Sequence, residues 1–223
     1  MGMRLDSRLV TLGLASSRAR AKELICGGQI TVNGMPVRKV SVEVFDSDEI
    51  LCAGGQLPFV GRGGLKLAHG VEQFHISLTG LTCLDIGAST GGFTDCMLQN
   101  GAQRVYSVDV GYGQLAWKLR TDERVVNMER TNIRNVTPDM LGDKIAFFSV
   151  DVSFISLKHI FPVADTICTP DAVGVCLVKP QFEAGREKVG KKGVVREPAT
   201  HAEVLHMAQS YAMANHFTPA GLD

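Results

Sequence analysis

The stretch Leu81–Asp95, L-T-C-L-D-I-G-A-S-T-G-G-F-T-D, decides the fold of this chain. It predicts a short buried strand over Leu81–Leu84, a turn rich in small residues from Gly87 to Gly92, and a helix over residues 93–100. α/β proteins hold nucleotide-like ligands at such a turn, because backbone N–H groups and the helix dipole meet the ligand there. The spacing G-x-x-x-G-G matches neither the dinucleotide fingerprint nor the phosphate loop. A nucleoside-type ligand is therefore our first interpretation, and a plain structural turn is the alternative.

The chain after residue 80 alternates strand patterns with helix patterns. This alternation predicts an α/β fold with a parallel sheet that is covered by helices on both faces. The expected strands are Leu81–Leu84, Arg104–Val108, Val125–Met128, Ile145–Val150 and Ala172–Val178. The expected helices are 93–100, Gln114–Leu119, Leu157–Thr166 and Pro198–Asn215.

Four of these strands are each followed by a charged residue, namely Asp85, Asp109, Asp151 or Lys179. Because the carboxyl ends of parallel strands line one crevice, we expect these side chains to converge beside the glycine turn. Asp109 is placed to accept hydrogen bonds from ribose hydroxyls, Asp85 to shape the turn, and Asn132 to meet an adenine edge. Asp151 and Lys179 form the candidate chemical pair, and a structural ion pair is the alternative.

The composition indicates a folded protein with segregated charge. Hydrophobic residues make up 45% of the 223 residues, charged residues make up 21%, and the formal net charge is zero. Residues 1–40 hold seven Lys or Arg against two acidic residues, whereas residues 41–50 hold four acidic residues. A basic N-terminal segment of this kind favours a polyanionic partner.

The six cysteines contain no C-x-x-C pair and lie mostly in apolar runs. They are interpreted as buried thiols of a reducing compartment rather than as disulfides or metal ligands. No signal peptide and no membrane-spanning run is found. We therefore expect a cytoplasmic protein with no metal site and no membrane contact.

The N-terminal segment predicts a small α+β domain. Helices are expected from Leu5 to Gly13 and from Ser16 or Ser17 to Cys26, followed by a strand over Gln29–Val32. Asn33-Gly34 predicts a hairpin turn, and Val37–Val44 predicts the returning strand. The Gly/Pro-rich stretch Ala53–Phe59 predicts a linker, so the expected domains are 1–55 and 60–223.

The residues R-L-D-S-R-L, S-S-R-A-R-A-K-E-L-I-C-G-G and T-V-N-G-M-P-V-R-K resemble the small RNA-binding fold of ribosomal protein S4 over residues 3–51. That resemblance implies helices that grip structured RNA through its backbone. A solvated helix surface is the alternative interpretation of the same charges. The implied RNA-binding residues are Arg4, Arg8, Arg18, Arg20, Lys22 and Lys39.

From Phe59 onward the chain resembles the FtsJ-like group of S-adenosyl-L-methionine-dependent RNA 2′-O-methyltransferases, which have a Rossmann-like sheet. The motifs that carry the resemblance are R-G-G-L-K-L (62–67), D-I-G-A-S-T-G-G-F-T-D (85–95), V-D-V-G (108–111), Q-L-A-W-K-L-R (114–120), M-E-R-T-N-I-R (128–134), V-D-V-S-F-I-S-L (150–157) and L-V-K-P-Q-F-E-A-G-R (177–186). With the S4-like module ahead, the chain resembles in particular the TlyA family, whose members are often labelled hemolysins.

The resemblance implies roles for single residues. Lys66, Asp151 and Lys179 match three members of the group's catalytic Lys-Asp-Lys-Glu set. The implied cofactor-binding residues are Asp85, Gly87, Ala88, Ser89, Thr90, Gly91, Gly92, Phe93, Asp109, Val110, Asn132 and Asp151. The group's final Glu is expected beyond Asp223, so the chain is expected to lack the closing strands and that residue.

The resemblance also implies the partner, which is ribosomal RNA or a ribosomal subunit. Two other functions stay open from the sequence. A non-catalytic RNA- or ribosome-binding protein is the first, and a membrane-active hemolysin is the second. The second has no support from a spanning segment or from a long basic amphipathic helix.

Overall fold

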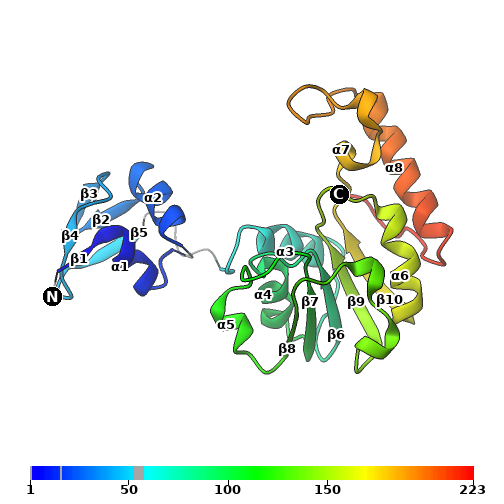
Figure 1. Ribbon diagram of the computed structural model, residues 1–223, viewed down its shortest axis with the longest axis horizontal. Coiled ribbons are helices and arrows are strands. Elements are labelled where there is room, and N and C mark those ends of the chain that lie inside the picture. The colour runs from blue at the N-terminus through cyan, green and yellow to red at the C-terminus, as the bar shows by residue number, and fades with distance from the viewer. Residues whose placement is uncertain (1, 16, 53–57) are drawn as a thin grey trace. The chain divides into compact units, whose positions relative to one another are not determined.

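The computed structural model describes residues 2–15, 17–52 and 58–223, and it forms two compact units, Met1–Gly61 and Arg62–Asp223 (Figure 1). The expected linker falls mostly on residues 53–57, which lie outside the described residues. Each unit encloses a hydrophobic core of its own.

The first unit contains two helices and two small antiparallel sheets. Its elements are β1 (Met3–Arg4), α1 (Leu5–Thr11), α2 (Arg18–Cys26), β2 (Ile30–Val32), β3 (Met35–Val37), β4 (Glu43–Val44) and β5 (Ile50–Cys52). The strand orders are β3-β2-β5 and β1-β4. Leu5, Leu9 and Ile25 are fully buried between the helices and the strands.

Both helices and the hairpin turn form where the sequence predicts them. Ser17 caps α2, because its side chain accepts a hydrogen bond from the N–H of Arg20. Asn33 and Gly34 both have positive φ (50° and 78°), as a two-residue hairpin requires. The returning strand predicted over Val37–Val44 is wrong. The hairpin partner β3 ends at Val37, and β4 leaves to pair with β1, because an alternating apolar pattern does not identify the partner strand.

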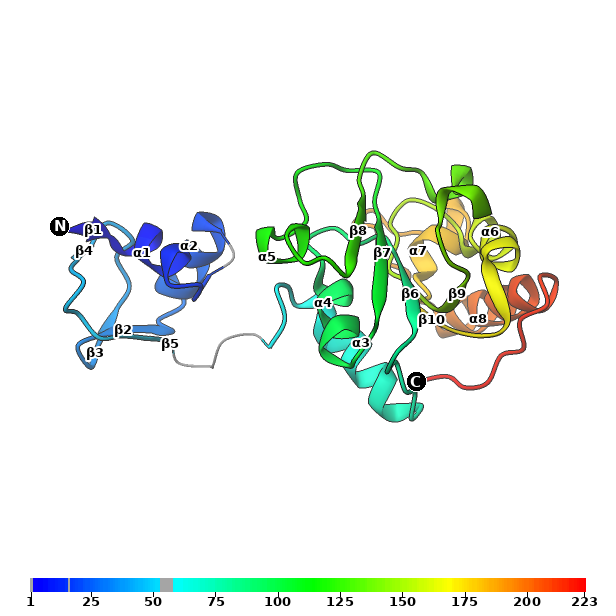
Figure 2. The same cartoon turned by 90° about the horizontal axis from the view of Figure 1, so that it is seen from below.

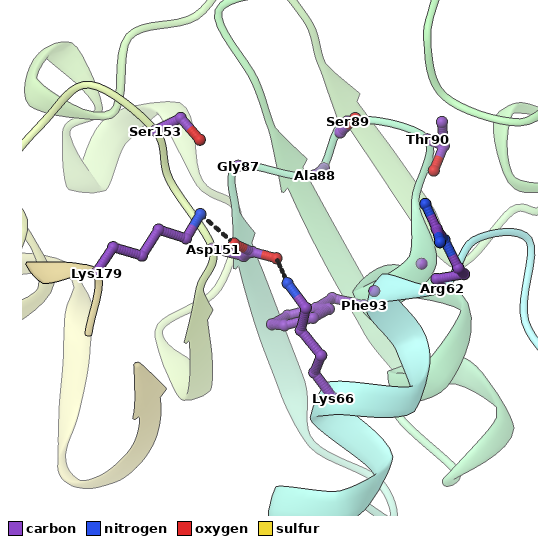
Figure 3. A pocket seen from close by; sticks show the side chains of 12 residues that line it. Arg62, Lys66, Gly87, Ala88, Ser89, Thr90, Phe93, Asp151, Ser153 and Lys179 are labelled. Atoms are coloured by element: carbon purple, nitrogen blue, oxygen red, sulfur yellow. Dashed lines mark hydrogen bonds and ion pairs between the residues drawn. The ribbon is translucent and has the colours of Figure 1, made fainter. Parts of the chain in front are cut away.

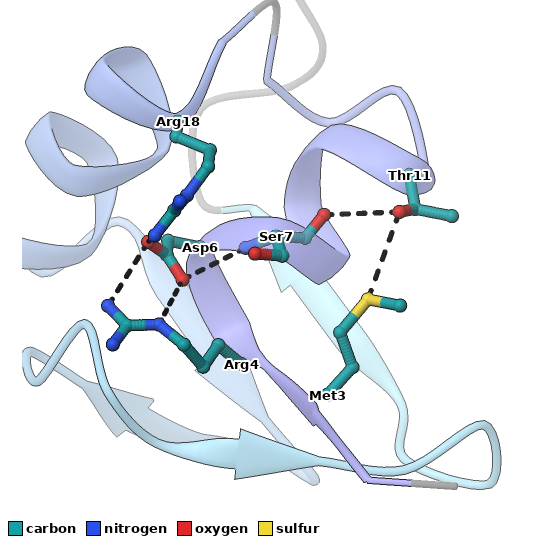
Figure 4. Close-up of polar contacts among 6 residues, drawn as sticks. All are labelled: Met3, Arg4, Asp6, Ser7, Thr11 and Arg18. Atoms are coloured by element: carbon teal, nitrogen blue, oxygen red, sulfur yellow. Dashed lines mark hydrogen bonds and ion pairs between the residues drawn. The ribbon is translucent and has the colours of Figure 1, made fainter.

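A buried carboxylate joins the start of α1 to the start of α2. The Asp6 side chain accepts hydrogen bonds from Arg4 Nε at 3.0 Å, from the Ser7 N–H at 3.0 Å and from Arg18 Nη2 at 2.8 Å (Figure 4). Only 3% of Asp6 is exposed. The hydrogen bond from Arg4, supported by that from Arg18, lowers the pKa of Asp6 from 3.8 to about 2.

We expect Asp6→Asn to destabilise this unit by about 1–2 kcal/mol at neutral pH, because the neutral amide loses both charge-assisted contacts. The folded pKa lies below the unfolded one, so the stabilisation is present above pH 3.8 and is lost as the pH falls towards 2. Hydrogen exchange of α1 and α2, followed against pH, checks this. The wild type should lose protection in acid and the variant should not. Equal protection of both proteins at pH 7 would contradict the assignment.

The second unit is a Rossmann-like parallel sheet. Its strands are β6 (Thr82–Ile86), β7 (Arg104–Val108), β8 (Val125–Met128), β9 (Ile145–Val150) and β10 (Cys168–Cys176), in the order β10-β9-β6-β7-β8. Every pair of neighbours is parallel. The strand order reverses at β6, which makes the carboxyl ends of β6 and β9 the expected place for a ligand. The predicted fold class is confirmed.

Helices cover both faces of this sheet. The helical segments are α3 (Gly63–Gln73), α4 (Gly92–Gln99), α5 (Trp117–Arg120), η1 (Ile133–Asn135), η2 (Pro138–Met140), η3 (Leu157–His159), α6 (Phe161–Ile167), α7 (Pro180–Glu183), η4 (Arg186–Lys188) and α8 (Pro198–Met213). Figures 1 and 2 show α3 and α4 on one side of the sheet and α6 and α8 on the other. Phe147 and Phe148 of β9 are buried between these layers.

Several element boundaries differ from the prediction. The helix predicted over Leu157–Thr166 is split into η3 and α6, and the helix predicted over Gln114–Leu119 is reduced to the single turn α5. β10 begins four residues earlier than expected and ends at Cys176. β6 extends two residues further than predicted, so Asp85 lies inside the strand rather than after it.

The cysteines are all free thiols. Cys83, Cys96 and Cys168 are buried, as expected, whereas Cys26 is exposed because it closes α2 at the surface. Burial raises the pKa of each of these three buried thiols to about 12. Across the described ranges, no helix has the length and apolar character that a membrane span needs.

Candidate active site

The strand register brings three sequence-distant segments together at one edge of the sheet. Ile86 lies in register with Val108 on one side and with Val150 on the other. The residues that follow, Gly87, Asp109 and Asp151, therefore stand side by side. Backbone hydrogen bonds hold this row, from the Gly87 N–H to Val108 O at 2.9 Å and from the Asp151 N–H to Ile86 O at 3.0 Å.

Gly87 is required by close packing as well as by its backbone angle. Its φ is +91°, and a Cβ atom at this position would lie 2.7 Å from the backbone oxygen of Asp151. Gly91 also has positive φ (+92°), but its Cβ would meet Leu119 and Leu115 rather than the cleft. Gly91 therefore makes room for the packing of Leu115 and Leu119.

A cleft of about 560 Å³ opens above the glycine turn (Figure 3). This volume is typical of small-molecule sites. The lining residues that the sequence predicted are Lys66, Gly87, Ala88, Ser89, Thr90, Gly92, Phe93, Asp151 and Lys179. The sequence reasoning assigned no site role to Arg62, Gly63 and Ser153, which also line the cleft. Arg62 and Gly63 lie in the motif that contains Lys66, and Ser153 lies two residues after Asp151. Their closeness in sequence to predicted site residues is the signal that could have identified them.

Two lysines from opposite sides of the cleft meet one carboxylate. Lys179 Nζ lies 2.5 Å from Asp151 Oδ1, and Lys66 Nζ lies 3.2 Å from Asp151 Oδ2 (Figure 3). Lys179 Nζ also donates a hydrogen bond to the backbone oxygen of Val152 at 2.8 Å. The side chain of Asp151 is 19% exposed and that of Lys179 is 22% exposed, whereas that of Lys66 is 53% exposed. Lys179 is therefore the lysine whose position is set by the protein.

A further carboxylate holds the segments around this cluster together. Glu183 in α7 accepts hydrogen bonds from Ser156 Oγ at 2.6 Å and from the Leu157 N–H at 2.8 Å. It thus ties α7, which begins directly after Lys179, to the loop that follows Asp151. This connection helps to set the distance between the Lys179 amine and the Asp151 carboxylate.

Asp109 supports the glycine turn from the neighbouring strand. Its carboxylate accepts hydrogen bonds from the Ser89 N–H at 2.8 Å and from the Gly111 N–H at 2.7 Å. Each oxygen keeps a free lone pair for a further donor. Val110 is 71% exposed, and Asn132 is exposed with its side-chain oxygen occupied by the Arg134 N–H. Neither these two residues nor Asp109 is part of the cleft lining.

Asp85 lies below the turn and does not reach the cleft. It is fully buried, and its Oδ2 accepts hydrogen bonds from the Thr94 N–H at 2.9 Å and from Thr94 Oγ1 at 2.7 Å. Ser149 Oγ approaches its Oδ1 at 3.3 Å. The expected convergence of three carboxylates in one crevice is thus wrong for Asp85, which instead joins β6 to the first turn of α4. Burial raises the pKa of Asp85 to about 6, although the hydrogen bonds from Thr94 lower it.

We expect Asp85→Asn to remove part of the pH dependence of stability. The folded pKa of Asp85 is above the unfolded value of 3.8, so the folded state retains a proton that the unfolded chain releases. Its contribution to the free energy of unfolding is largest below pH 3.8 and declines as the pH rises through 6, by at most about 1.4 kcal/mol per pH unit. Asparagine keeps an acceptor for Thr94 and cannot ionise.

Urea unfolding between pH 4 and 7, followed by the fluorescence of Trp117, the single tryptophan, tests this expectation. The difference between variant and wild type should grow in favour of the variant as the pH rises. A difference that stays constant over this range would contradict it.

Two family models match the chain. The model described as FtsJ-like methyltransferase matches residues 59–222, and the model described as S4 domain matches residues 3–50. The chain belongs to the FtsJ-like methyltransferase family. Its first unit contains the S4 domain, as the resemblance of the sequence implied.

Curated relatives and a solved structure agree with this membership. The chain is 46% identical over 208 residues to the protein named 16S/23S rRNA (cytidine-2′-O)-methyltransferase TlyA of Mycobacterium tuberculosis. The match covers 92% of this chain and 78% of the relative. It is 41% identical over 209 residues to Hemolysin A of Brachyspira hyodysenteriae, with coverage of 93% and 87%. A solved structure described as "Putative hemolysin from Streptococcus thermophilus" is 44% identical with a TM-score of 0.77, and covers 100% of this chain and 82% of that one.

Most of the basic residues predicted to bind RNA in the S4 domain pair with acidic residues of the same domain. Arg4 and Arg18 contact Asp6, Arg8 contacts Asp46, and Arg20 contacts Glu23. The side chain of Arg8 is only 17% exposed, so it offers little surface to a partner. Within the described part of the chain, no ion pair is formed by Lys22 or Lys39, so these two are the most available to a polyanion among the six predicted residues.

Proposed function

We propose that this FtsJ-like methyltransferase transfers a methyl group from S-adenosyl-L-methionine to a ribose 2′-hydroxyl of ribosomal RNA. The observation that carries the proposal is the cluster of Lys66, Asp151 and Lys179 beside the glycine turn at the switch point of the sheet. The relative from Mycobacterium tuberculosis is named for this reaction on 16S and 23S rRNA, which supports the choice of substrate.

The residues around the turn fit S-adenosyl-L-methionine. The backbone from Gly87 to Gly92 passes along the cleft without bulky side chains, which suits close contact with a ligand. Asp109 has lone pairs left for ribose hydroxyls, and it sits after the strand where an acidic residue usually takes that role. We assign the ribose to Asp109 and the amino-acid part to the turn, with Asn132 as the candidate for the adenine edge.

When bound, the cofactor would supply an activated methyl group whose carbon–sulfur bond breaks with the electron pair leaving on sulfur. Lys179, which is paired with Asp151, must release a proton to solvent before its nitrogen accepts the proton of the 2′-hydroxyl, while that oxygen forms its bond to the methyl carbon. The resulting ammonium lies 2.5 Å from the Asp151 carboxylate, which stabilises it. Lys66 shares this carboxylate and, being more exposed, is placed to hold the nucleotide.

Positive charge around the cleft suits an RNA substrate. Arg62, Lys66 and Lys179 line it against the single carboxylate of Asp151, so the site attracts phosphate. The S4 domain supplies further backbone contacts, which give affinity more than base selection.

Incubation of the protein with methyl-labelled S-adenosyl-L-methionine and purified ribosomal subunits tests the proposal. A 2′-O-methyl group removes the hydroxyl that attacks the neighbouring phosphodiester, so the label should appear in alkali-resistant dinucleotides. DNA of matching sequence, which lacks the 2′-hydroxyl, should take up no label. Labelled bases, or cofactor binding with no label in RNA, would reject the proposed reaction.

A further inference from the structure

A second cleft, of about 450 Å³, lies in the segment between α7 and α8, and its lining is strongly basic. Lys188, Lys191, Lys192 and Arg196 line it, and Glu197 is the only acidic residue among the lining. All four cations are exposed. Since the whole chain has a formal net charge of zero, this is a segregated patch. We call residues 188–196 the basic loop.

The basic loop is closed by its own backbone hydrogen bonds and is anchored beside α8 at one residue. The Gly190 N–H donates to Val194 O at 3.1 Å, and the Gly193 N–H donates to Gly190 O at 2.8 Å, which closes a turn. Val195 is 7% exposed and packs with Ala184 and Val204 in a small core of its own. The backbone positions from which the charged side chains extend are therefore set by the fold of the loop.

Among the described residues, three of the four cations have no acidic partner. Lys188 pairs with Glu203 of α8 at 2.5 Å, which anchors the loop. In the described ranges, Lys191, Lys192 and Arg196 form no ion pair and no side-chain hydrogen bond. Like charges held close together repel, so an arrangement of this kind is stabilised by an anion with several charges.

We propose that the basic loop binds the phosphodiester backbone of the RNA substrate, as a contact surface additional to the S4 domain. The inference rests on the proposed function for the identity of the polyanion. The loop follows α7, which begins after Lys179, and Figure 1 shows it (orange) projecting beyond α7. It would hold RNA near the cleft through phosphate contacts that do not depend on base sequence.

The test compares the variant Lys191→Gln/Lys192→Gln/Arg196→Gln with wild type in binding a fluorescently labelled RNA stem-loop over a range of salt concentrations. Loss of three phosphate contacts should weaken binding about tenfold or more at physiological salt. It should also flatten the slope of log Kobs against log salt by about 2–3. The variant Lys191→Arg/Lys192→Arg, which keeps the charge, should retain the wild-type slope.

A control variant also removes three positive charges, but from the amino ends of the strands of the sheet. Arg104, Arg124 and Lys144 lie at or just before the amino ends of β7, β8 and β9, so Arg104→Gln/Arg124→Gln/Lys144→Gln should leave the slope unchanged. An unchanged slope in the loop variant, or an equal change in the control, overturns the inference.

The outcome is separable from that of the proposed function. Cofactor affinity, measured by calorimetry, should be the same in the loop variant and in wild type, because the loop does not line the first cleft. If wild type transfers no methyl group to ribosomal subunits, the proposed function fails, while the salt slopes still decide whether the loop contacts RNA.

Discussion

Replacing Lys179 with alanine will lower kcat for methyl transfer by about 10²–10⁴ and leave the affinity for S-adenosyl-L-methionine close to that of wild type. Lys179 Nζ is fixed by Asp151 at 2.5 Å and by the Val152 backbone oxygen at 2.8 Å, so its nitrogen is positioned before the substrate arrives. The variant loses this proton acceptor and keeps the glycine turn. Single-turnover rates with ribosomal subunits, together with calorimetry of the cofactor, measure both quantities.

Two further variants separate chemistry from structure. Lys179→Arg should not restore the rate, because the guanidinium keeps its proton and has a different shape. Lys66→Ala removes the other cation that contacts Asp151, and it should raise KM for RNA more than it lowers kcat. If the cluster is only a structural ion pair, Lys179→Ala will lower the melting temperature while the rate per folded molecule stays near that of wild type. That result would remove Lys179 from the mechanism.

The sequence predicted the parallel sheet and the position of the candidate site because both follow from local patterns. Apolar runs identify β7, β8 and β9, and Asp109 and Asp151 follow two of these strands directly. The strand register then aligns the two carboxylates with Gly87, as the rule for parallel sheets requires.

The rule that charged residues at the ends of parallel strands meet in one crevice does not hold for Asp85. The apolar run Leu81–Leu84 predicts a strand that ends before Asp85, whereas the structure buries this carboxylate inside β6, where an unpaired charge would be costly. The chain instead compensates that cost with the Thr94 hydroxyl and amide and with the hydroxyl of Ser149. Those partners come from a helix and from another strand, and no local sequence pattern predicts them.

Side-chain pairing was the other limit of sequence reasoning. Arg8 and Arg18 appear in the sequence as free positive charges, but Asp46 and Asp6 reach them across the S4 domain. In the same way, Glu183 had no assigned role until the structure placed it against Ser156 and Leu157. Such contacts depend on the tertiary fold and not on spacing along the chain.

Gly87→Ala will be the most damaging small substitution in the glycine turn. Two costs add at this position. The first is the positive φ of +91°, which costs a residue with a Cβ atom about 1–2 kcal/mol. The second is the contact of that Cβ with the backbone of Asp151, at 2.7 Å from its oxygen and 3.0 Å from its carbonyl carbon. The Asp151 backbone is hydrogen-bonded to Ile86 and cannot move aside as a flexible side chain can, so we expect a further loss of about 1–3 kcal/mol.

Gly113→Ala supplies the matched control, because Gly113 has φ of +69° and its Cβ would meet no atom within 4 Å. This control should show the conformational cost alone, with methyl transfer per folded molecule unchanged. Gly87→Ala should lose more stability in urea unfolding and should also lower kcat, since the displaced backbone carries the Asp151 carboxylate away from Lys179. Equal losses of stability in the two variants, with full activity in both, would show that close packing between Gly87 and Asp151 does not position the site.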